Sequence, residues 1–354
     1  MEEYPEYLKG RGAQINPPNP YLKGDYDTQA EDGLDEALVP DPKTEFIPEH
    51  PKKIINKVTS PDVPMDYSIN PYQGCEHGCV YCYARNAHTY WGYSAGLDFE
   101  RKIIYKPEAP KLLKEAFEKK SWKAHPIMLS GNTDCYQPGE RNFKLTRGLL
   151  EVFLQYKNPV GIVTKNSLIL RDLDILCELA KENLVHVFLS VTTLEPELRR
   201  LMEPRTATGQ KRVEVIRQLS AAGVPTGALL GPIIPGLNNH EIPKLVKTVA
   251  DAGASAVGYT FIRLNGQIKE IFEHWLRETY PDRADKVLNQ IRASHGGKLN
   301  DSEYGRRMRG EGEIAESISR LFKLAKKQHM ADRAMPAYNL EAFRRPGDGQ
   351  LSLF

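Results

Sequence analysis

The sequence has no apolar run that approaches the roughly 18 residues that a membrane-spanning helix needs. Its first residues, MEEYPEYLKGRG, are acidic and polar and do not resemble a secretory signal peptide. It also has no excess of one charge, because 48 Lys and Arg residues nearly balance 46 Asp and Glu residues. These absences predict a cytoplasmic protein without a membrane segment, in which nucleic-acid binding would depend on a local basic patch.

Cysteine is scarce as well, with five in 354 residues, and three of the five lie in the segment 75–82. So few and so clustered cysteines exclude the disulfide framework of a small secreted protein. In a reducing compartment, such a cluster is more often a metal site. The three clustered cysteines are therefore the first candidates for chemistry.

Short apolar or β-branched segments alternate with amphipathic helical segments from about residue 65 onward. The predicted strands cover Tyr67–Pro71, Pro126–Ser130, Val160–Thr164, Val185–Val191, Pro225–Leu230 and Ala256–Ile262. The predicted helices cover Lys111–Lys120, Lys144–Tyr156, Leu168–Lys181, Lys211–Ala222 and Glu241–Ala252. Repeated strand–helix units favour an α/β fold, either a partial (β/α)6 TIM-like barrel or a full barrel, with its functional loops at the carboxyl ends of the strands. A doubly wound open sheet is the alternative.

The two ends of the chain differ from this pattern. Residues 1–60 are rich in Pro, Asp, Glu and Lys and show no sustained period, which predicts an irregular extension around a core of residues 61–300. Apolar periodicity in IKEIFEHWLRETY and AESISRLFKLAKKQ predicts helices after the last strand. We therefore expect a helical extension over residues 301–343 and a flexible tail over residues 344–354.

Cys75, Cys79 and Cys82 form a C-x3-C-x2-C motif directly after the first predicted strand. Three thiolates at this spacing suit three irons of a cubane and leave the fourth iron open to another ligand. A zinc knuckle with His77 or His88 as fourth ligand is one alternative, although zinc sites usually add a second, distant cysteine or histidine pair. A chance group of buried thiols is the other, and the flanking glycines and polar residues disfavour it.

This motif, with Tyr81 just before its third cysteine, resembles the signature of the radical S-adenosylmethionine (SAM) superfamily. The resemblance implies a barrel of the radical SAM type and a 4Fe-4S cluster on the three cysteines. It also implies that S-adenosyl-L-methionine binds the open iron through its amino and carboxylate groups. One electron, from a reductant such as flavodoxin or ferredoxin, would then cleave SAM to methionine and a 5′-deoxyadenosyl radical.

Over about residues 61–300 the chain resembles the branch that contains spore photoproduct lyase, which repairs a thymine dimer in DNA, and more closely a bacterial subfamily related to that lyase. Tyr81 and Tyr83 flank Cys82 as two tyrosines flank the third cysteine of the lyase, where they assist radical transfer. Simple packing beside the cluster is the alternative for both. The resemblance implies a lyase-like DNA-repair enzyme.

The same resemblance assigns SAM-binding roles to Thr133 in SGNTD, Lys165 in TKN and Ser190 in LSVTT. Each of the three lies at the end of a predicted strand, where the binding loops of a barrel gather. A lysine at the end of an apolar strand is costly unless an anion, such as the SAM carboxylate, pairs with it. An exposed lysine at the strand end is the alternative. Glu203 and Arg205 in LMEPR are a further polar pair, near the site or in a surface salt bridge.

The chain departs from the lyase at the hydrogen-donating cysteine, whose position falls at or near Gly131. The nearby thiol is Cys135 instead. It would return a hydrogen atom to a substrate radical or serve only as a small apolar residue. Dimer reversal is therefore not predicted.

The last five residues resemble the pentapeptide with which bacterial replication and repair proteins bind the DNA sliding clamp. They are Gln350, Leu351, Ser352, Leu353 and Phe354, with the last two as apolar anchors. Docking of the tail on its own fold is the alternative. A clamp partner favours a DNA substrate, with phosphate contacts from Arg306, Arg307, Arg309, Arg344 and Arg345 unless these form a solvated face.

Three functions follow from these observations. The first is a radical SAM enzyme of DNA repair that acts on a base turned out of the stack. The second is a radical SAM enzyme that acts on RNA, a peptide or a metabolite. The third is a zinc or iron–sulfur adaptor without catalysis.

Overall fold

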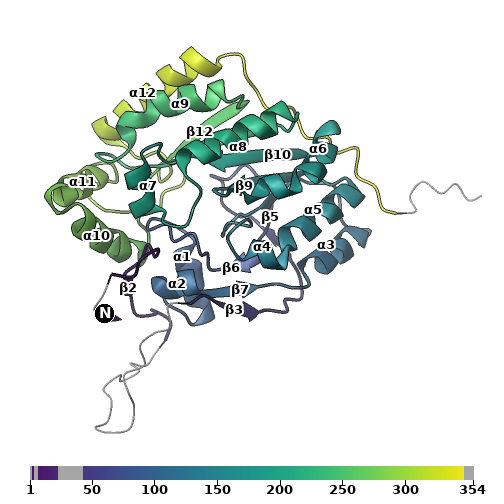
Figure 1. Ribbon diagram of the computed structural model, residues 1–354, viewed down its shortest axis with the longest axis horizontal. Coiled ribbons are helices and arrows are strands. Elements are labelled where there is room, and N and C mark those ends of the chain that lie inside the picture. Colours follow the sequence, from purple (N-terminus) through teal and green to yellow (C-terminus); the bar gives the residue numbers. More distant parts are fainter. Residues whose placement is uncertain (1, 4–6, 23–42, 347–354) are drawn as a thin grey trace, which may run out of the picture.

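The computed structural model describes residues 2–3, 7–22 and 43–346, and a curved sheet lies at its centre (Figure 1). The strand order is β12-β11-β10-β9-β8-β5-β4, and all neighbours are parallel except the edge pair β5 and β4. The strands are β4 (Ile55–Lys57), β5 (Tyr67–Ile69), β8 (Ile127–Leu129), β9 (Val160–Thr164), β10 (Val185–Ser190), β11 (Thr226–Ile233) and β12 (Ala256–Phe261). All six predicted strands are present.

The strand order distinguishes the two predicted architectures. From β5 to β12, each parallel strand lies beside the one before it, so the sheet always grows in one direction. A doubly wound sheet would reverse direction at a switch point. The partial six-stranded barrel is therefore confirmed, and the doubly wound alternative is wrong.

The crossover helices pack on the outer face of this sheet, along the top and right of Figure 1. They are α3 (Ala109–Glu118), α5 (Leu145–Tyr156), η2 (Ser167–Asp172) with α6 (Leu173–Lys181), α8 (Gly209–Ala221) and α9 (Ile242–Asp251). In α9, Leu245, Val246 and Val249 are buried, whereas Lys244 and Lys247 are exposed. This one-sided apolar spacing is why the sequence predicted all five helices.

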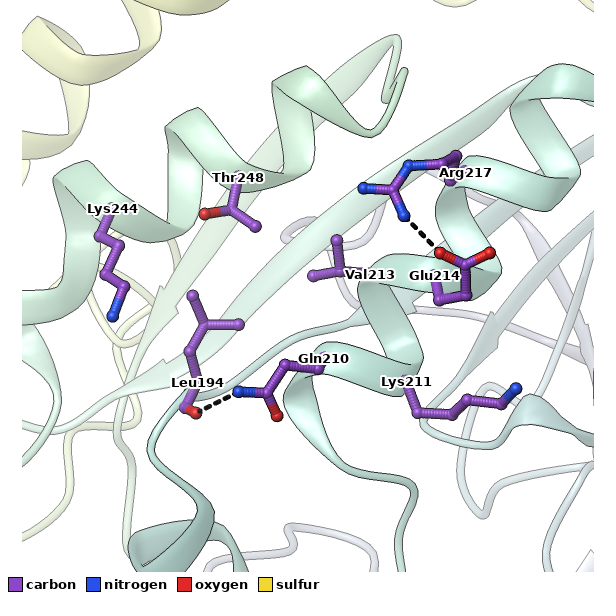
Figure 2. A pocket seen from close by; sticks show the side chains of 8 residues that line it. All are labelled: Leu194, Gln210, Lys211, Val213, Glu214, Arg217, Lys244 and Thr248. Carbon is purple, nitrogen blue, oxygen red and sulfur yellow. Dashed lines mark hydrogen bonds and ion pairs between the residues drawn. The ribbon is translucent and has the colours of Figure 1, made fainter.

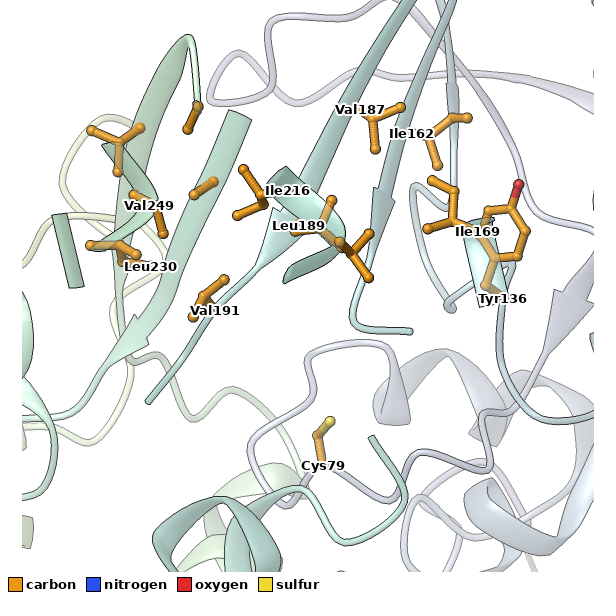
Figure 3. Close-up of a cluster of buried hydrophobic side chains, with 14 of the residues drawn as sticks. Cys79, Tyr136, Ile162, Ile169, Val187, Leu189, Val191, Ile216, Leu230 and Val249 are labelled. Atoms are coloured by element: carbon orange, nitrogen blue, oxygen red, sulfur yellow. The ribbon is translucent and has the colours of Figure 1, made fainter. Parts of the chain in front are cut away.

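The barrel core consists of strand side chains that are buried on both faces of the sheet, which explains why the strands read as continuous apolar runs. Figure 3 shows Val187, Leu189 and Val191 from the β10 segment near Ile216 of α8, with Cys79 on a separate loop beside the strands. All four apolar side chains are fully buried. The core thus positions the strand ends around the loop that carries Cys75, Cys79 and Cys82, called the cysteine loop below (Figure 3).

A second, three-stranded sheet lies at the bottom of Figure 1, in the order β3-β7-β6. Its strands are β3 (Glu45–Pro48), β6 (Tyr72–Gln73) and β7 (Lys102–Tyr105). β3 and the main-sheet strand β4 fall within residues 1–60, as does the short pair β1 (Glu2–Glu3) and β2 (Ile15–Asn16). These strands have two to four residues, too few for a recognisable alternation, so the sequence did not predict them.

Short helices follow the cysteine motif, and longer ones follow the last strand. The short ones are α1 (Arg85–His88), η1 (Thr89–Trp91), α2 (Leu97–Arg101), α4 (Glu140–Phe143) and α7 (Pro196–Met202). The long ones, as predicted from apolar periodicity, are α10 (Ile268–Thr279) and α12 (Gly312–Met330), with α11 (Pro281–Ala293) between them. None of the helices in the described ranges is long and apolar enough to cross a membrane.

The predicted flexible tail begins with ordered contacts. The Arg344 amide donates to the Tyr156 carbonyl at 3.1 Å, and the Arg345 guanidinium donates to backbone carbonyls of Phe117, Lys119 and Trp122. Arg344 and Arg345 are therefore docked on α5 and on the end of α3 with the turn that follows it. The pentapeptide Gln350–Phe354 lies outside the described residues.

Candidate active site

Cys75, Cys79 and Cys82 lie on one loop between β6 and α1, and all three are free thiols. Cys75 and Cys79 are buried, and Cys82 is partly buried. The Cys75 amide donates to the Phe99 carbonyl at 2.8 Å, and the Cys82 amide donates to the Cys79 carbonyl at 3.3 Å. These backbone bonds fix the fold of the loop, and Cys79 and Cys82 both raise the pKa of Cys75, so the three thiols lie near one another.

Burial raises the pKa of each of the three thiols, and the neighbouring cysteines and the Asp134 carboxylate add to this effect for Cys75. The backbone N–H groups of His77 and Ala84 oppose it at Cys75 and Cys82, respectively. The thiols are therefore protonated without a metal, and metal binding must release their protons.

Within the described ranges, no three His, Cys, Asp or Glu side chains surround a point where a single metal ion would bind. A cubane makes a different demand, because each thiolate binds its own iron. The donor set fits such a cluster, since three soft thiols lie on one loop. The His77 Nδ1 lies 3.3 Å from Asp134 and its Nε2 lies 3.2 Å from the Asn166 amide, so both ring nitrogens of His77 have partners. His88 packs beside Tyr93 and Phe99, and its buried ring nitrogens have no hydrogen-bond partner among the described residues.

An N-terminal segment, residues 11–13, holds the cysteine loop in place. A Cβ atom on Gly12 would lie 1.7 Å from the Gly78 carbonyl oxygen, so the two backbones are in direct contact. The buried Glu100 carboxylate accepts hydrogen bonds from the amides of Gly12 and Ala13 at 3.0 and 2.8 Å. It also binds the fully buried Arg85 guanidinium at 2.5 Å. The segment, α1 and α2 thus form one support beneath the loop.

Gly12→Val tests this support. The valine side chain would overlap the Gly78 backbone, and such overpacking costs about 1–3 kcal/mol. We expect a lower melting temperature and a lower iron content after anaerobic reconstitution. Gly258→Ala is the control, because its Cβ would contact only a Leu229 side-chain atom, at 3.3 Å. Equal iron content in the two variants would contradict the role of the segment.

Asp134, which ends the SGNTD motif, connects the cysteine loop to the neighbouring strand β9. Its carboxylate accepts hydrogen bonds from the Thr164 hydroxyl and the Lys165 amide, both at 2.8 Å, and faces His77. Burial would raise the pKa of Asp134, but the His77 imidazole and the donated hydrogen bonds hold it below its ordinary value. The carboxylate therefore stays charged and fixes the ends of β8 and β9 against the loop.

Three of the predicted residues, Tyr81, Lys165 and Ser190, meet around the fully buried Glu203. The Lys165 ammonium donates to the Ser190 hydroxyl at 2.8 Å, lies 3.6 Å from the Glu203 carboxylate and sits 5.5 Å from the centre of the Tyr81 ring. The Tyr81 hydroxyl donates to the same carboxylate. We call these four residues the Lys165 cluster.

The sequence missed the main partner of Glu203, which is Arg212 of α8. Their ion pair is buried on both sides, and the Thr192 hydroxyl adds a hydrogen bond of 2.7 Å to the carboxylate. Burial would raise the pKa of Glu203, but the charges of Arg212 and Lys165 lower it. The predicted pairing of Glu203 with Arg205 is wrong, because Arg205 lies 3.5 Å from Glu76 instead. A single arginine in an amphipathic helix gives no signal that it points inward.

The remaining predicted residues lie apart from the Lys165 cluster. The Thr133 hydroxyl donates to the Tyr72 carbonyl at 2.6 Å and is buried. Cys135 is fully buried in the core, where its carbonyl accepts a hydrogen bond from Thr146 at 2.6 Å. Tyr83 is exposed, and its hydroxyl donates to the Gly131 carbonyl at 2.8 Å. The SAM-binding role of Thr133 and the catalytic roles of Tyr83 and Cys135 remain predictions.

Two of the arginines predicted to contact phosphates already pair with acids of this chain. Arg306 binds Asp301 at 2.5 Å, and Arg307 binds Asp62 at 2.5 Å. Their charges are thus largely compensated within this chain, and phosphate contacts from these arginines remain a prediction.

Buried His88, just after the cysteine loop, makes the stability of the fold depend on pH. Burial lowers the pKa of His88 to about 4, although the Asp98 carboxylate opposes this. The unfolded chain therefore binds more protons than the folded one between about pH 4 and the ordinary value of 6.5. Stability is fully present above that window and is lost as the pH falls through it.

His88→Phe keeps the aromatic packing against Tyr93 and Phe99 but cannot titrate. We expect the unfolding free energy of the wild type to fall by about 2 kcal/mol more than that of the variant between pH 7.5 and pH 5. Urea unfolding at both pH values measures the difference. The exposed control His240→Gln should follow the wild type. Parallel losses in wild type and His88→Phe would contradict the assignment.

The described part of the protein surface has two grooves, of which one adjoins this site. One lies between α8 and α9, where Figure 2 shows Lys211, Glu214 and Lys244 among its lining residues. None of the cysteines and no member of the Lys165 cluster lines it. The other groove, of 680 Å³, includes Gly131 and Asn132, beside the point where Tyr83 contacts the SGNTD turn. It is therefore the groove next to the cysteine loop.

The Radical SAM superfamily family model matches residues 69–249, more than half of the chain. This segment begins in β5 and ends in α9, so it contains the cysteine loop, Asp134 and the Lys165 cluster. The chain belongs to the radical SAM superfamily. Membership implies a 4Fe-4S cluster and SAM as cofactors, and the free thiols of the cysteine loop are a donor set that fits the cluster.

Two relatives of this radical SAM chain cover most of its core. An uncharacterised protein of Mycobacterium tuberculosis (strain ATCC 25618 / H37Rv) is 32% identical over 244 residues, which cover 68% of this chain and 72% of the relative. An uncharacterised protein of Methanocaldococcus jannaschii is 30% identical over 248 residues, covering 70% and 88%, respectively.

Solved structures of spore photoproduct lyase share the radical SAM fold of this chain. A mutant of that lyase aligns with a TM-score of 0.59 at 17% identity, covering 80% of this chain and 79% of the lyase chain. Another mutant, with bound AdoMet and dinucleoside spore photoproduct, aligns with a TM-score of 0.57 at 16% identity and the same coverage. At such low identity the likeness shows the fold alone.

Proposed function

We propose that this radical SAM protein is an enzyme that reductively cleaves S-adenosyl-L-methionine and acts on DNA in a lyase-like repair reaction. One observation carries the proposal. The loop with Cys75, Cys79 and Cys82 meets the charged Lys165 cluster at the carboxyl ends of the parallel strands β9 and β10. In barrel enzymes this is the edge at which binding and catalytic groups gather.

The positions of the side chains suggest which of them would bind the cluster and which would bind SAM. The three cysteines would hold the 4Fe-4S cluster, which supplies the electron that cleaves bound SAM and so provides a 5′-deoxyadenosyl radical. Lys165 and Ser190, 2.8 Å apart, would bind the SAM carboxylate, because an ammonium and a hydroxyl are both donors to it. Glu203, whose carboxylate lies 3.6 Å from the Lys165 ammonium, would hold that ammonium in place. Thr133 would join them only if its hydroxyl turns away from the Tyr72 carbonyl.

The two tyrosines would have different roles. Tyr81 lies within the cysteine loop, and because it is buried and bound to Glu203, its ring would be held in one position. Tyr83 is exposed and reaches the Gly131 carbonyl, so it would face the substrate and relay a radical. Cys135 would need a path through the packed core to donate a hydrogen atom.

Two features support DNA as the substrate. The fold is shared with a lyase whose solved complex holds a dinucleoside spore photoproduct. The pentapeptide Gln350–Phe354 also resembles a sliding-clamp ligand, and a clamp partner would bring the enzyme to DNA. A flavodoxin or ferredoxin would supply the electron.

Anaerobic reconstitution tests the enzymatic part of the proposal. Protein loaded with iron and sulfide, reduced with dithionite and given SAM should release 5′-deoxyadenosine, measured by mass spectrometry. A non-catalytic adaptor would release none, and that result would refute the proposal. Deuterated damaged DNA, undamaged DNA and RNA then serve as parallel substrates. Deuterium in the 5′-deoxyadenosine formed with deuterated DNA supports DNA as the substrate. Deuterium that appears only with deuterated RNA assigns the enzyme to RNA.

The clamp partner is tested separately by surface plasmon resonance with an immobilised bacterial sliding clamp. The full chain should bind, and a chain truncated after residue 349 should lose binding. A second variant, with Leu353 and Phe354 both replaced by alanine, isolates the two apolar anchors. Undiminished binding by the truncated chain would remove the tail as support for DNA.

A further inference from the structure

The groove beside Gly131 has a composition that the radical chemistry does not explain. It is lined by three lysines and one glutamate, Glu49, together with amide side chains and Trp91. It adjoins the predicted reaction site, because Tyr83, next to Cys82, donates to the Gly131 carbonyl at 2.8 Å. A substrate held in this groove would lie next to Tyr83.

The charge of the groove is unevenly distributed. At its floor, buried Lys106 lies 3.8 Å from the Glu49 carboxylate and donates to the Asn70 carbonyl at 3.1 Å, so its charge is compensated. Lys52 and Lys53 are exposed, and neither has a carboxylate partner among the residues that the structure describes. The whole chain has a formal net charge of only +2, so these two lysines form a local positive rim. Such a rim attracts an anionic chain.

One aromatic side chain lines the groove, and its neighbour in the sequence is part of a stacked pair of tyrosines. Trp91 lines the groove and is 39% exposed, and its neighbour Tyr90 is 75% exposed. Tyr90 stacks on exposed Tyr21 with ring centres 5.1 Å apart. Exposed, oriented rings beside lysines are the combination by which proteins bind unpaired nucleotides, since bases stack on the rings and phosphates face the lysines.

The groove also contains an ordered set of amides. The Asn132 side-chain amide donates to the Gln73 side-chain oxygen (Oε1) at 2.8 Å, and the Asn132 backbone amide donates to the Asn70 side-chain oxygen at 2.7 Å. These bonds orient the side chains. In the described ranges they leave the Asn132 oxygen and the Gln73 amide nitrogen without a protein partner, one acceptor and one donor. A base edge requires such a pair.

We propose that this groove binds a single strand of DNA. Lys52 and Lys53 contact its phosphates, Trp91 stacks on one base, and Asn132 with Gln73 contacts the edge of the base beside Gly131. This inference rests on the proposed function, because it specifies the form of DNA at the same site. A duplex would have to expose a base before that base could reach the groove.

Fluorescence anisotropy with a labelled 12-nucleotide strand and the full-length, iron-loaded chain tests the inference. The double variant Lys52→Gln and Lys53→Gln should weaken binding at least tenfold at about 50 mM salt. It should also reduce the slope of log Kd against log salt by about 1.4, the effect of two lost phosphate contacts to a single strand. Trp91→Ala should weaken binding about 5- to 150-fold, as for one lost stacked base, and Trp91→Phe should restore much of it.

The matched control removes the same charge from the other groove, with Lys211→Gln and Lys244→Gln, which are exposed lining residues in Figure 2. This control should bind the strand like the wild type. Equal affinity of the groove variants and the control would overturn the inference, and so would stronger binding of RNA or of intact duplex. Release of 5′-deoxyadenosine without DNA is measured on the same samples. If it persists while the groove variants bind normally, the groove assignment fails and the proposed enzyme stands.

Discussion

Cys79→Ser is expected to yield a folded protein that holds no 4Fe-4S cluster and releases no measurable 5′-deoxyadenosine. A serine hydroxyl is a poor ligand for a soft metal, whereas thiolates are suited to iron–sulfur clusters. Loss of partners outside the ligand shell of a metal already costs about 10–100-fold, so loss of a direct ligand should reduce activity by at least about 100-fold. Cys75→Ser and Cys82→Ser should behave alike, because all three thiols lie on one loop.

The measurement combines iron and sulfide content, the absorbance of the cluster and 5′-deoxyadenosine release. Cys177→Ser is the matched control, because Cys177 lies on α6, away from the loop, with its sulfur 3.7 Å from the Ala222 carbonyl. It should keep the full cluster and full activity. Cys135→Ser should keep the cluster too, and a selective loss of product formation would support Cys135 as hydrogen donor. A full cluster in Cys79→Ser would refute the ligand assignment.

Glu203→Gln is expected to destabilise the fold by about 3–5 kcal/mol, because it leaves the buried Arg212 guanidinium without its negative partner. It also removes the carboxylate that lies 3.6 Å from Lys165 and binds the Tyr81 hydroxyl. We therefore expect a lower urea midpoint and weaker SAM binding in the same variant.

A double variant separates the charge effect from general damage. When Arg212→Met is added to Glu203→Gln, no unpaired buried arginine remains, so the loss should be clearly smaller than the sum of the two single losses. Glu195→Gln is the matched control, because Glu195 is exposed at the other end of α7, and it should change stability by less than about 0.5 kcal/mol. Additive losses, or a Glu203→Gln variant as stable as the control, would contradict the role of the buried pair.

Much of the candidate site could be predicted because its signals are local. The spacing of Cys75, Cys79 and Cys82 is readable within eight residues, and Lys165 and Ser190 stand at strand ends that apolar runs mark clearly. Glu203 was noticed but paired with the wrong arginine. Its true partner, Arg212, lies nine residues away along the chain and points inward from a helix whose other charges face solvent.

The support of the cysteine loop could not be predicted, for a related reason. Gly12 contacts Gly78, and Ala13 binds Glu100, across 66 and 87 residues of chain, respectively. Contacts over such distances follow no period and belong to no motif in a single sequence. The same holds for the groove, which brings Lys52, Trp91 and Asn132 together from three separate segments.

The sequence by itself determined the alternation of six strands with helices and the cysteine motif, because backbone periodicity and ligand spacing depend only on neighbouring residues. Only the tertiary structure decided which charges meet. Burial makes an unpaired charge costly, so Lys165, Glu203 and Arg212 pair with one another inside the fold, whereas Lys52 and Lys53 lie exposed at its surface. Packing decides which charged side chains are buried and which are exposed, and a pattern of neighbouring residues in the sequence does not contain this information.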